Sequence, residues 1–328
     1  MNKGVAVTGL GIISSIGDTT DENFDNLCAK NAGISTPEIL QTRHHHLPVG
    51  EIKYSNDQLI AKIGLLKKNT ATRAALLGIF AIEQILQDLD IKNFPGETGL
   101  ISGTSVGGMD MTERFYFDYK NNKSNRKYIQ AQHPGFTTET IAAHFNINSF
   151  VTTISTACSS GANAIMQGAR LIEAGVLKRV IVGGTDCLTQ FTLNGFNSLK
   201  ILASSDSKAF DENRNGLNLG EGAAYLLLEA EDFLEGREVL GRVSGYGNAN
   251  DAFHQTASSK DGEGAYLAMQ KALNMARIPF KNISYINAHG TGTLNNDLAE
   301  SIALKRIFGD TIPDFSSTKA YTGHTLEL

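Results

Sequence analysis

Short runs of apolar, β-forming residues alternate with helical stretches along the whole chain, and this alternation constrains the fold more than any other feature. Residues 5–10, 99–103 and 150–155 are expected to be strands. Residues 69–90 are expected to form an amphipathic helix, because apolar side chains recur there at spacings of four and three. Strands that alternate with helices predict an α/β fold. Further strands are expected at residues 179–183, 223–228, 285–291 and 315–318, and further helices at residues 159–174 and 262–276.

The composition of the chain excludes several classes of function. Its 328 residues include 29 Lys and Arg against 34 Asp and Glu, so there is no basic footprint for nucleic acid or anionic lipid. The longest apolar run, residues 74–82, is too short to cross a bilayer. Three cysteines without a Cys-x-x-Cys pair argue against a disulfide framework or a zinc module. We therefore expect a cytoplasmic protein that binds neither nucleic acid nor membrane.

Two sequence patterns resemble cofactor sites but lack the residues that such sites need. Residues 9–14 (GLGIIS) follow a strand as a dinucleotide-binding loop does, yet serine stands at the third glycine position and no acidic residue ends a strand about 20 residues later. We interpret this run as a tight turn from strand to loop. The histidines at 44–46 have no cysteine or acidic companion at ligand spacing, which predicts an exposed loop rather than a metal site.

Cys158 lies in the sequence STACSSG, at the junction between an expected strand and an expected helix. A thiol at a helix N-terminus is at the positive end of the helix dipole, which favours the thiolate, and backbone N–H groups there can stabilise an oxyanion. Because a free cysteine is also a common core residue, we assign Cys28 and Cys187 to packing. The helix at residues 159–174 has small residues nearly all round, which predicts packing on several sides.

Two histidines favour the interpretation of Cys158 as a nucleophile. His289, in AHGTGT, and His324, in YTGH, each lie at the C-terminal end of an expected strand beside glycine and hydroxyl residues. Functional sites of α/β proteins gather at such strand ends. We therefore expect both histidines to face Cys158 in one polar site, and we leave His254 as a loop residue.

The second part of the chain repeats features of the first. The strand with a Gly-Thr ending at residues 285–291 resembles residues 99–105. Such an echo predicts two similar halves, residues 1–240 with the nucleophile and residues 241–328. The second half stops just after His324, where the first half continues with a helix and two strands. We therefore expect a C-terminally truncated domain that lacks this last helix and these strands.

Taken together, these residues resemble the elongating β-ketoacyl-[acyl-carrier-protein] synthases of the thiolase superfamily, over essentially the whole chain. The Cys–His–His set resembles this type rather than degradative thiolases, which have Cys–His–Cys, or priming synthases, which carry asparagine in place of His324. The segments that carry the resemblance are TACSSG at 156–161, FD at 210–211 with Arg214, GEGA at 220–223, NAHGTGT at 287–293 with Asn296, Asp297 and Glu300, STK at 317–319 and TGH at 322–324.

The resemblance implies a five-layered α/β/α/β/α thiolase fold made of two duplicated halves. It also implies a decarboxylative Claisen condensation of an acyl thioester with malonyl on acyl carrier protein, in fatty acid or in polyketide or aryl-polyene biosynthesis. Cys158 would hold the acyl group as a thioester. His289 and His324 would donate N–H hydrogen bonds to the malonyl thioester oxygen as it gains charge, without becoming charged themselves.

Further site residues follow from the same resemblance. Lys319 and Glu300 resemble catalytic residues beside the histidines, although an ordinary salt bridge would also explain them, and Asp297 resembles an acid that organises the site. For the two acyl-pocket residues, Phe196 and Val106, an ordinary position in the hydrophobic core is an equally good interpretation. The residues that resemble substrate contacts are Thr291, Thr293 and Thr256 for the phosphopantetheine arm, and Phe196 and Val106 for the acyl pocket.

The resemblance implies no cofactor of the protein's own, because phosphopantetheine arrives on the acyl carrier protein. Acyl carrier protein is the expected partner, with Arg126 and Lys127 as candidate docking residues, and the expected assembly is a homodimer. No metal is expected in the site.

Three alternatives remain open at this point. The chain could be an inactive truncated remnant, or pseudoenzyme, of the same fold. It could serve polyketide or aryl-polyene synthesis rather than membrane fatty acids. A Cys–His thioester hydrolase is a third interpretation, but it assigns no function to His324 and Lys319.

Overall fold

The computed structural model describes residues 4–66, 69–254 and 258–326 of the chain. No helix in this described part is long and apolar enough to span a membrane. The strands are β1 (Val5–Ser14), β2 (Ile34–Ser35), β3 (Val49–Gly50), β4 (Thr98–Gly103), β5 (Val151–Ile154), β6 (Arg179–Asp186), β7 (Gly222–Ala230), β8 (Gly241–Arg242), β9 (Tyr285–Asn287) and β10 (Asp314–Ser316). The α-helices are α1 (Thr20–Cys28), α2 (Asn56–Lys62), α3 (Arg73–Asp88), α4 (Met109–Phe115), α5 (Arg126–Ile129), α6 (Pro134–His144), α7 (Ser160–Glu173), α8 (Gln190–Ser198), α9 (Glu263–Ala276), α10 (Leu294–Phe308) and α11 (Lys319–Thr322).

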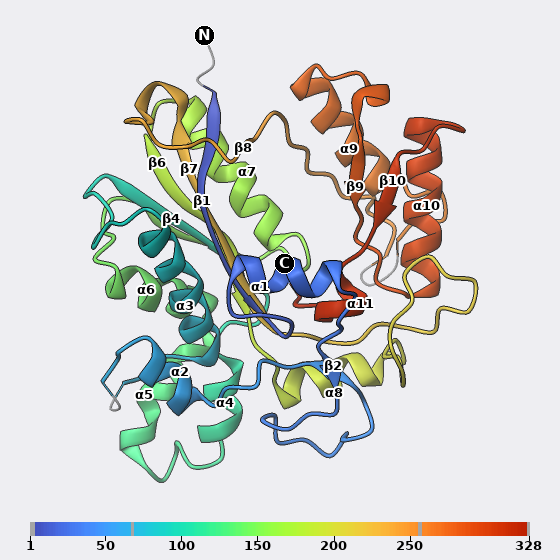
Figure 1. Cartoon of the computed structure of the whole chain (residues 1–328). Helices are drawn as coiled ribbons and strands as arrows, with labels where there is room; N and C mark the ends of the chain where they lie inside the picture. Colours follow the sequence, from blue (N-terminus) through green and yellow to red (C-terminus); the bar gives the residue numbers. More distant parts are fainter. Residues whose placement is uncertain (1–3, 67–68, 255–257, 327–328) are drawn as a thin grey trace.

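A mixed sheet forms the centre of the fold (Figure 1). Its strands, counted over the described residues, are six in the order β5-β4-β6-β7-β1-β8. β4 lies between β5 and β6 and runs parallel to both, whereas β7 runs antiparallel to its neighbours β6 and β1. Because the three parallel strands end at one edge of the sheet, the turn after β5 that carries Cys158 lies at the edge where functional sites of α/β folds gather.

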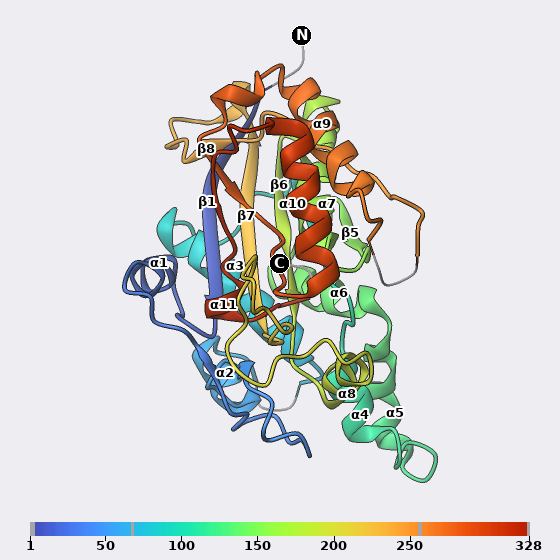
Figure 2. The ribbon, with the colours of Figure 1, turned by 90° about the vertical axis from the view of Figure 1, so that its right-hand side faces the viewer.

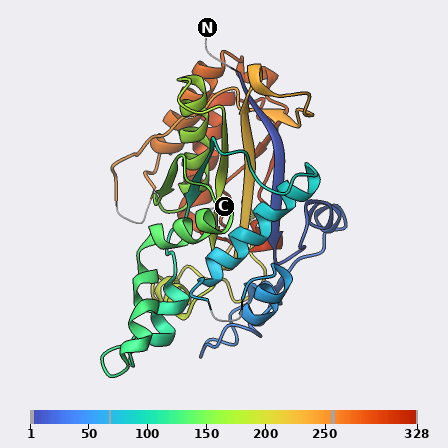
Figure 3. The same ribbon diagram turned by 90° about the vertical axis from the view of Figure 1, so that its left-hand side faces the viewer.

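Successive residues of the central strands pack against helices on opposite faces of this sheet. Leu100 and Leu227 belong to the core cluster that contains the apolar side chains of α3 and α6. Their chain neighbours Ile101 and Leu228 pack with α7 instead. This alternation is the period-2 pattern of a strand that is buried on both sides. Figure 3 shows α3 and α6 in front of the sheet, and Figure 2, seen from the opposite side, shows α10 in front.

The C-terminal elements repeat this arrangement on a smaller scale. β9 runs parallel to β10 as β4 does to β5, and α9 packs on α10 as α3 packs on α6. Across Figure 1, α3 and α6 lie on one side of the large sheet and α7 on the other, followed by the β9–β10 pair, which α9 overlaps in this view, and by α10. The expected five-layered α/β fold is confirmed. The division into residues 1–240 and 241–328 stays a prediction.

The glycine-rich run at residues 9–14 lies inside a strand, so the expected turn from strand to loop is wrong. β1 continues through these residues along β7. A Cβ at Gly9 would overlap the side chain of Ile85, and a Cβ at Gly11 would overlap the backbone oxygen of Ala81. The glycines are required because α3 packs directly on this strand, not because the backbone turns.

Small residues in two helices pack differently from expectation. Cys187 is buried as expected, but Cys28 is exposed at the end of α1, a helix whose buried side is provided by Asn23. In α7, Gly168 is buried against the large sheet while Ala162 is exposed. α7 therefore packs closely on the sheet and also contacts the segment after β8 through Glu173 and Asn163, while part of its surface is exposed.

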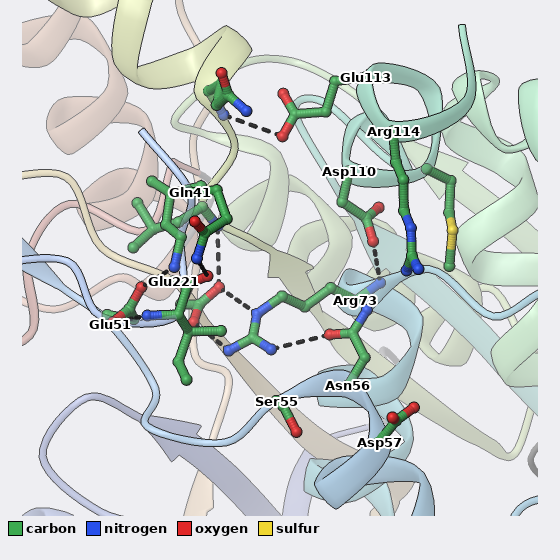
Figure 4. Close-up of a pocket in the computed structure, with 15 residues that line it drawn as sticks. Gln41, Glu51, Ser55, Asn56, Asp57, Arg73, Asp110, Glu113, Arg114 and Glu221 are labelled. Carbon is green, nitrogen blue, oxygen red and sulfur yellow. Dashed lines mark hydrogen bonds and ion pairs between the residues drawn. The ribbon is translucent and has the colours of Figure 1, made fainter. Parts of the chain in front are cut away.

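A buried ion pair ties the start of α3 to the start of β7 (Figure 4). Arg73 Nε and Nη2 donate to the two carboxylate oxygens of Glu221 at 2.8 and 2.6 Å. Arg73 also donates to the carbonyl oxygens of Tyr54 and Ile52, and Glu221 also accepts the N–H groups of Ile52 and Leu188. Arg73 and Glu221 line a cavity of about 520 Å³ whose wall contains none of the candidate site residues. Since this pair is satisfied within the protein, we interpret it as a structural support.

Replacing Arg73 by Met should lower the free energy of unfolding by about 3–5 kcal/mol, because Glu221 then remains buried without its partner. The matched control is Arg242→Met, which breaks the pair with Glu231 whose side chains are 60% and 38% exposed. This control should change stability by less than about 1 kcal/mol. Urea denaturation measures both. Equal losses for the two variants would contradict a supporting role for the buried pair.

Candidate active site

Cys158 lies in a tight turn between β5 and α7. Ala157 has a left-handed φ of 53°, a conformation that costs a residue with a Cβ roughly 1–2 kcal/mol. The turn is held by Ser160, whose Oγ accepts the N–H of Thr156 at 2.9 Å and donates to the carbonyl of Ala157 at 2.7 Å. Because α7 begins at Ser160, the thiol lies just before the positive end of the helix dipole, as the sequence predicted.

The environment of Cys158 nevertheless favours the neutral thiol, which corrects the expected preference for the thiolate. Burial raises the pKa of this thiol, and the charge of Lys319 and the backbone N–H of Cys158 lower it by less. Solvent still reaches the residue from the open side of the site.

His289 follows β9 and is positioned through its backbone. The carboxylate of Glu300 on α10 accepts the N–H groups of His289 and Gly290 at 2.7 and 2.9 Å. Ser317 Oγ donates to the carbonyl oxygen of His289 at 3.3 Å. Glu300 thus uses both oxygens on the loop that carries His289, in charge-assisted hydrogen bonds. The simple Lys319–Glu300 salt bridge that the sequence left open is not among the ion pairs of the described residues.

His324 is held by the segment that leads into β7. Its N–H donates to the carbonyl of Asn218 at 2.7 Å, and its carbonyl accepts the N–H of Gly220 at 2.9 Å. The two segments therefore pair like short parallel strands. A Cβ at Gly220 would overlap the backbone of Thr322 and Gly323. Glycine at this position allows the close approach that places His324 opposite the nucleophile.

Cys158, His289 and His324 converge on one point. The Cys158 sulfur lies 3.3 Å from Nε2 of His324. The sulfur and one nitrogen from each ring all lie within 4.8 Å of one another. The two rings are nearly perpendicular, at 86°, with centroids 5.3 Å apart. The structure therefore brings together the three residues that the sequence analysis selected, and their catalytic roles remain to be proposed below.

A backbone hydrogen bond fixes the tautomer of His324. The N–H of Leu326 donates to Nδ1 of His324 at 3.2 Å. A neutral imidazole that accepts at Nδ1 must carry its proton on Nε2. Nε2 is the nitrogen directed at the sulfur of Cys158. His324 is therefore arranged as an uncharged N–H donor that faces the nucleophile.

Burial determines the charge of the groups around this point. Burial first, and the charge of Lys319 second, lower the pKa of His289 to about 4. Burial also lowers the pKa of His324 well below its ordinary value, with smaller contributions from His289 and Lys319. The pKa of Lys319 is itself lowered by burial, although Cys158 and two nearby carboxylates raise it by less. Both histidines are therefore neutral at neutral pH, as donors to a developing oxyanion need to be.

Asp297 organises the loop between β9 and α10. Its buried carboxylate accepts the N–H of Phe210 at 2.7 Å and that of Gly292 at 3.2 Å. In the same loop the hydroxyl groups of Thr291 and Thr293 lie 2.8 Å apart. This geometry agrees with the supporting position expected for Asp297, which touches backbone groups rather than the three converging side chains.

An open cavity of about 860 Å³ leads to the converging residues. Cys158, His289 and His324 lie on its wall together with Thr291 and Thr293. The wall is partly apolar and partly hydroxylated, which suits a thioester with an amide-bearing arm. With Phe196, the sequence analysis thus selected six residues that share one cavity.

Other expected contacts fall in different places. Phe196 lines the cavity, whereas Val106 packs near it in an apolar cluster and does not reach the wall. Thr256 lies outside the described residues. His254, which we left as a loop residue, lies on the wall, and so does Lys200 after α8, a residue that sequence reasoning missed.

Asn163 is a further residue that sequence reasoning missed. Its Nδ2 donates to Thr156 Oγ1 at 2.8 Å and to Ser159 Oγ at 3.2 Å. Its Oδ1 accepts from Asn248 Nδ2 at 2.8 Å. Asn163 therefore braces the turn around Cys158 and connects it to the C-terminal part of the chain. An amide among small residues, little more than one turn after the cysteine, was the available signal.

Comparison with known proteins identifies the family. Residues 2–233 match the family described as "Beta-ketoacyl synthase, N-terminal domain", and residues 240–327 match "Beta-ketoacyl synthase, C-terminal domain". The chain belongs to the β-ketoacyl synthase family. Among relatives of this synthase is the 3-oxoacyl-[acyl-carrier-protein] synthase 2 of Staphylococcus aureus, 30% identical over 99% of this chain and 82% of that protein.

Solved structures of other ketosynthases share the fold of this β-ketoacyl synthase. The ishigamide ketosynthase/chain length factor superposes with a TM-score of 0.91 at 25% identity, covering 99% of this chain and 83% of that one. The ketosynthase ApeO of Xenorhabdus doucetiae, solved in complex with its chain length factor ApeC, gives a TM-score of 0.82 at 31% identity, covering 99% of this chain and 80% of that one.

The decarboxylation step of this synthase should proceed at a constant rate from about pH 7 to about pH 5, because His289 becomes charged only near its pKa of about 4. A histidine with the ordinary pKa of 6.5 would already be half charged at pH 6.5. Release of carbon dioxide in a single turnover of pre-acylated enzyme measures this step without the titration of Cys158. Circular dichroism over the same range controls for unfolding. A rate that halves near pH 6.5 would show that His289 is not held neutral.

Proposed function

We propose that Cys158, His289 and His324 carry out the decarboxylative condensation of an acyl thioester with malonyl on acyl carrier protein. The observation that supports this most is the meeting of one sulfur and two ring nitrogens within 4.8 Å on the wall of one cavity. The family and its acyltransferase class are given by the matches over residues 2–233 and 240–327. The assignment of each step to a residue is our proposal.

In the first step the sulfur of Cys158 attacks the acyl thioester. The thiol proton passes to the departing thiol of the carrier arm, so that one thioester forms as the other breaks. The pKa of Cys158 is raised by burial, and stabilisation of the thiolate is therefore needed as the attack begins. The Nε2–H of His324 at 3.3 Å and the start of α7 are the two donors placed for this.

In the second step a malonyl thioester loses carbon dioxide. Its carbon–carbon bond breaks, and the electron pair forms an enolate whose charge rests on the thioester oxygen. His289 and His324 donate N–H hydrogen bonds to this oxygen, and both remain neutral since burial holds their pKa values low. The enolate carbon then attacks the acyl group on Cys158, and the cysteine thiolate leaves.

The remaining residues position these groups. Glu300 fixes the loop of His289, and Asp297 fixes the loop with Thr291 and Thr293. We propose that these two hydroxyl groups contact the phosphopantetheine arm that the carrier protein brings, so that the enzyme needs no cofactor of its own. Lys319 acts through its charge, which lowers the pKa of both histidines and of Cys158.

Partner and pathway are also proposals. The Staphylococcus aureus relative is named as an acyl-carrier-protein synthase, and ApeO is a ketosynthase solved with a chain length factor. We propose acyl carrier protein as the donor of both substrates, in fatty acid or polyketide synthesis, and an assembly of two related subunits such as the expected homodimer. The cytoplasmic location expected from the sequence is likewise retained as a proposal.

Replacing Cys158 by Ala should abolish acyl transfer, because no other thiol lies on the cavity wall of the described residues. His289→Ala should still be acylated but should decarboxylate about 100–1,000-fold more slowly, since it loses one donor to the enolate oxygen. His324→Ala should slow both steps, because its N–H also faces the sulfur. Intact-protein mass measures acylation, and quenched-flow analysis measures carbon dioxide release.

The matched controls are Cys28→Ser, which changes an exposed thiol far from the cavity wall, and the two His→Asn variants, which keep an N–H donor. Cys28→Ser should behave as the unchanged protein, and the Asn variants should retain more decarboxylation than the Ala variants. Elongation by Cys158→Ala would refute the assigned nucleophile. Acyl-enzyme that only hydrolyses when malonyl carrier protein is added would favour the thioester hydrolase instead.

Charge reversal at Lys200 should weaken docking of the acidic carrier protein, because Lys200 lies on the cavity wall beside the exposed Leu199. We expect Lys200→Glu to raise KM for malonyl carrier protein about 2–5-fold, the size of one lost rim ion pair, with kcat little changed. A malonyl thioester of a short pantetheine analogue, which lacks the protein, should show no such change.

The comparison variant is Arg126→Glu with Lys127→Glu, which reverses the two charges on α5 that the sequence suggested for docking. Both side chains are exposed, but neither lies on the cavity wall. A smaller effect than that of Lys200→Glu is expected. A larger effect would place docking at α5 instead, and no effect of any variant would contradict electrostatic docking.

A further inference from the structure

The three converging side chains also form a potential set of metal ligands. Within the described residues, Cys158, His289 and His324 are the one group of three or more His, Cys, Asp or Glu side chains whose ligand atoms lie within reach of a single ion. One sulfur and two imidazole nitrogens are the ligand types that Zn²⁺ prefers. No sequence pattern indicates this site, because the three residues are far apart along the chain and none belongs to a zinc-binding spacing.

The geometry is close to that of an open zinc site. Zinc–sulfur and zinc–nitrogen bonds of about 2.3 and 2.0–2.1 Å place tetrahedral ligands about 3.5 Å apart. The sulfur of Cys158 and Nε2 of His324 are already 3.3 Å apart. The largest separation in the set is 4.8 Å, so the side chains must close by roughly 1 Å. His289 and Cys158 line the open cavity, which gives an ion access and leaves a fourth position for water.

One hydrogen bond opposes metal binding. A metal at Nε2 of His324 needs the lone pair where the proton now resides, so the proton must move to Nδ1. The N–H of Leu326 then loses its acceptor. A buried N–H without a partner costs about 1–3 kcal/mol, and this lowers metal affinity by about 5–150-fold at 25 °C. The same contact that makes His324 a donor for catalysis therefore keeps the site from being a tight zinc centre.

We propose that Cys158, His289 and His324 form a weak, reversible binding site for a thiophilic divalent cation such as Zn²⁺, and that occupation of this site switches the enzyme off. Binding replaces the thiol proton of Cys158, which is released to solvent, and no electron is transferred. A sulfur bound to metal cannot take an acyl group, and an acylated sulfur cannot bind metal. Metal and acyl group are therefore mutually exclusive. The metal site itself does not require the proposed condensation to be correct, whereas the loss of activity rests on the role proposed for Cys158.

Cobalt(II) added to the purified metal-free protein is the direct probe, because a thiolate bound to cobalt gives a charge-transfer absorption in the near ultraviolet. We expect this band with the unchanged chain and its loss in Cys158→Ala. His289→Asn and His324→Asn should each weaken cobalt binding by more than about 10-fold. Loss of a residue that only hydrogen-bonds to a metal ligand already lowers metal affinity by about 10-fold or more, and loss of a ligand should cost more. Zinc should displace cobalt and remove the band.

Two controls distinguish this site from nonspecific metal binding at surface side chains. Cys28→Ser removes an exposed thiol that lies outside the cluster, and His45→Asn with His46→Asn removes two exposed surface histidines. Neither should change the band. Alkylation of Cys158 by iodoacetamide should abolish it, and zinc should in turn slow that alkylation.

The absorption is read without any turnover, so it fails or succeeds separately from the proposed function. A band that is absent, that survives in Cys158→Ala, or that is indifferent to both histidine variants would overturn the metal site. A band that depends on Cys28, His45 or His46 would show surface binding and would also overturn it.

Discussion

The contact between the N–H of Leu326 and Nδ1 of His324 decides what the whole site can do. It places the ring proton on Nε2, 3.3 Å from the sulfur of Cys158. With the proton there, the ring is a donor to a thiolate or to an enolate oxygen. With the proton on Nδ1, the same ring would be a base or a metal ligand. A single backbone hydrogen bond therefore selects one chemistry from several that the side chains allow.

Backbone pairing within the fold holds His324 in the position where it faces Cys158. His324 lies where it does because its backbone pairs with residues 218–220, which lead straight into β7 of the central sheet. Glycine at 220 lets the two segments meet. Cys158 reaches the same point from the opposite side, at the end of β5 and the start of α7. Each half of the chain thus contributes one part of a site that neither contains alone.

The electrostatics of the site follow from burial more than from charge. Burial raises the pKa of Cys158 and lowers the pKa values of His289, His324 and Lys319, so every one of these groups is pushed toward its neutral form. A reaction that creates negative charge on a thioester oxygen gains most in such surroundings, because fixed dipoles stabilise that charge without water having to reorganise.

Sequence reasoning found the elements of the fold and the three central residues because both leave strong local patterns. Patterns at expected strand ends selected Cys158, His289 and His324 one by one, although α11 separates His324 from the end of β10. It failed where the outcome depends on tertiary packing. The glycines of residues 9–14 looked like a turn, but they make room for α3. The sequence alone does not show which element packs against a glycine, so this requirement could not be predicted.

Sequence reasoning also failed to predict the pKa of Cys158 and the hydrogen-bond partners that hold the site. The helix dipole predicted a thiolate at Cys158, yet the net effect of burial cannot be read from a strand-to-helix junction. Asn163 and the Leu326 N–H were missed because their importance lies in what they bond to. Val106 and Phe196 could not be told apart in sequence, and only Phe196 lies on the cavity wall.

The most direct test of the central claim is the tautomer of His324, read by nitrogen-15 NMR of the protein labelled at its histidine rings and assigned with His324→Asn. The account predicts a neutral ring at neutral pH with an unprotonated Nδ1 and a protonated Nε2. A proton on Nδ1, or on both nitrogens, would contradict the claim that the backbone of Leu326 holds His324 as an uncharged donor to the reacting thioester.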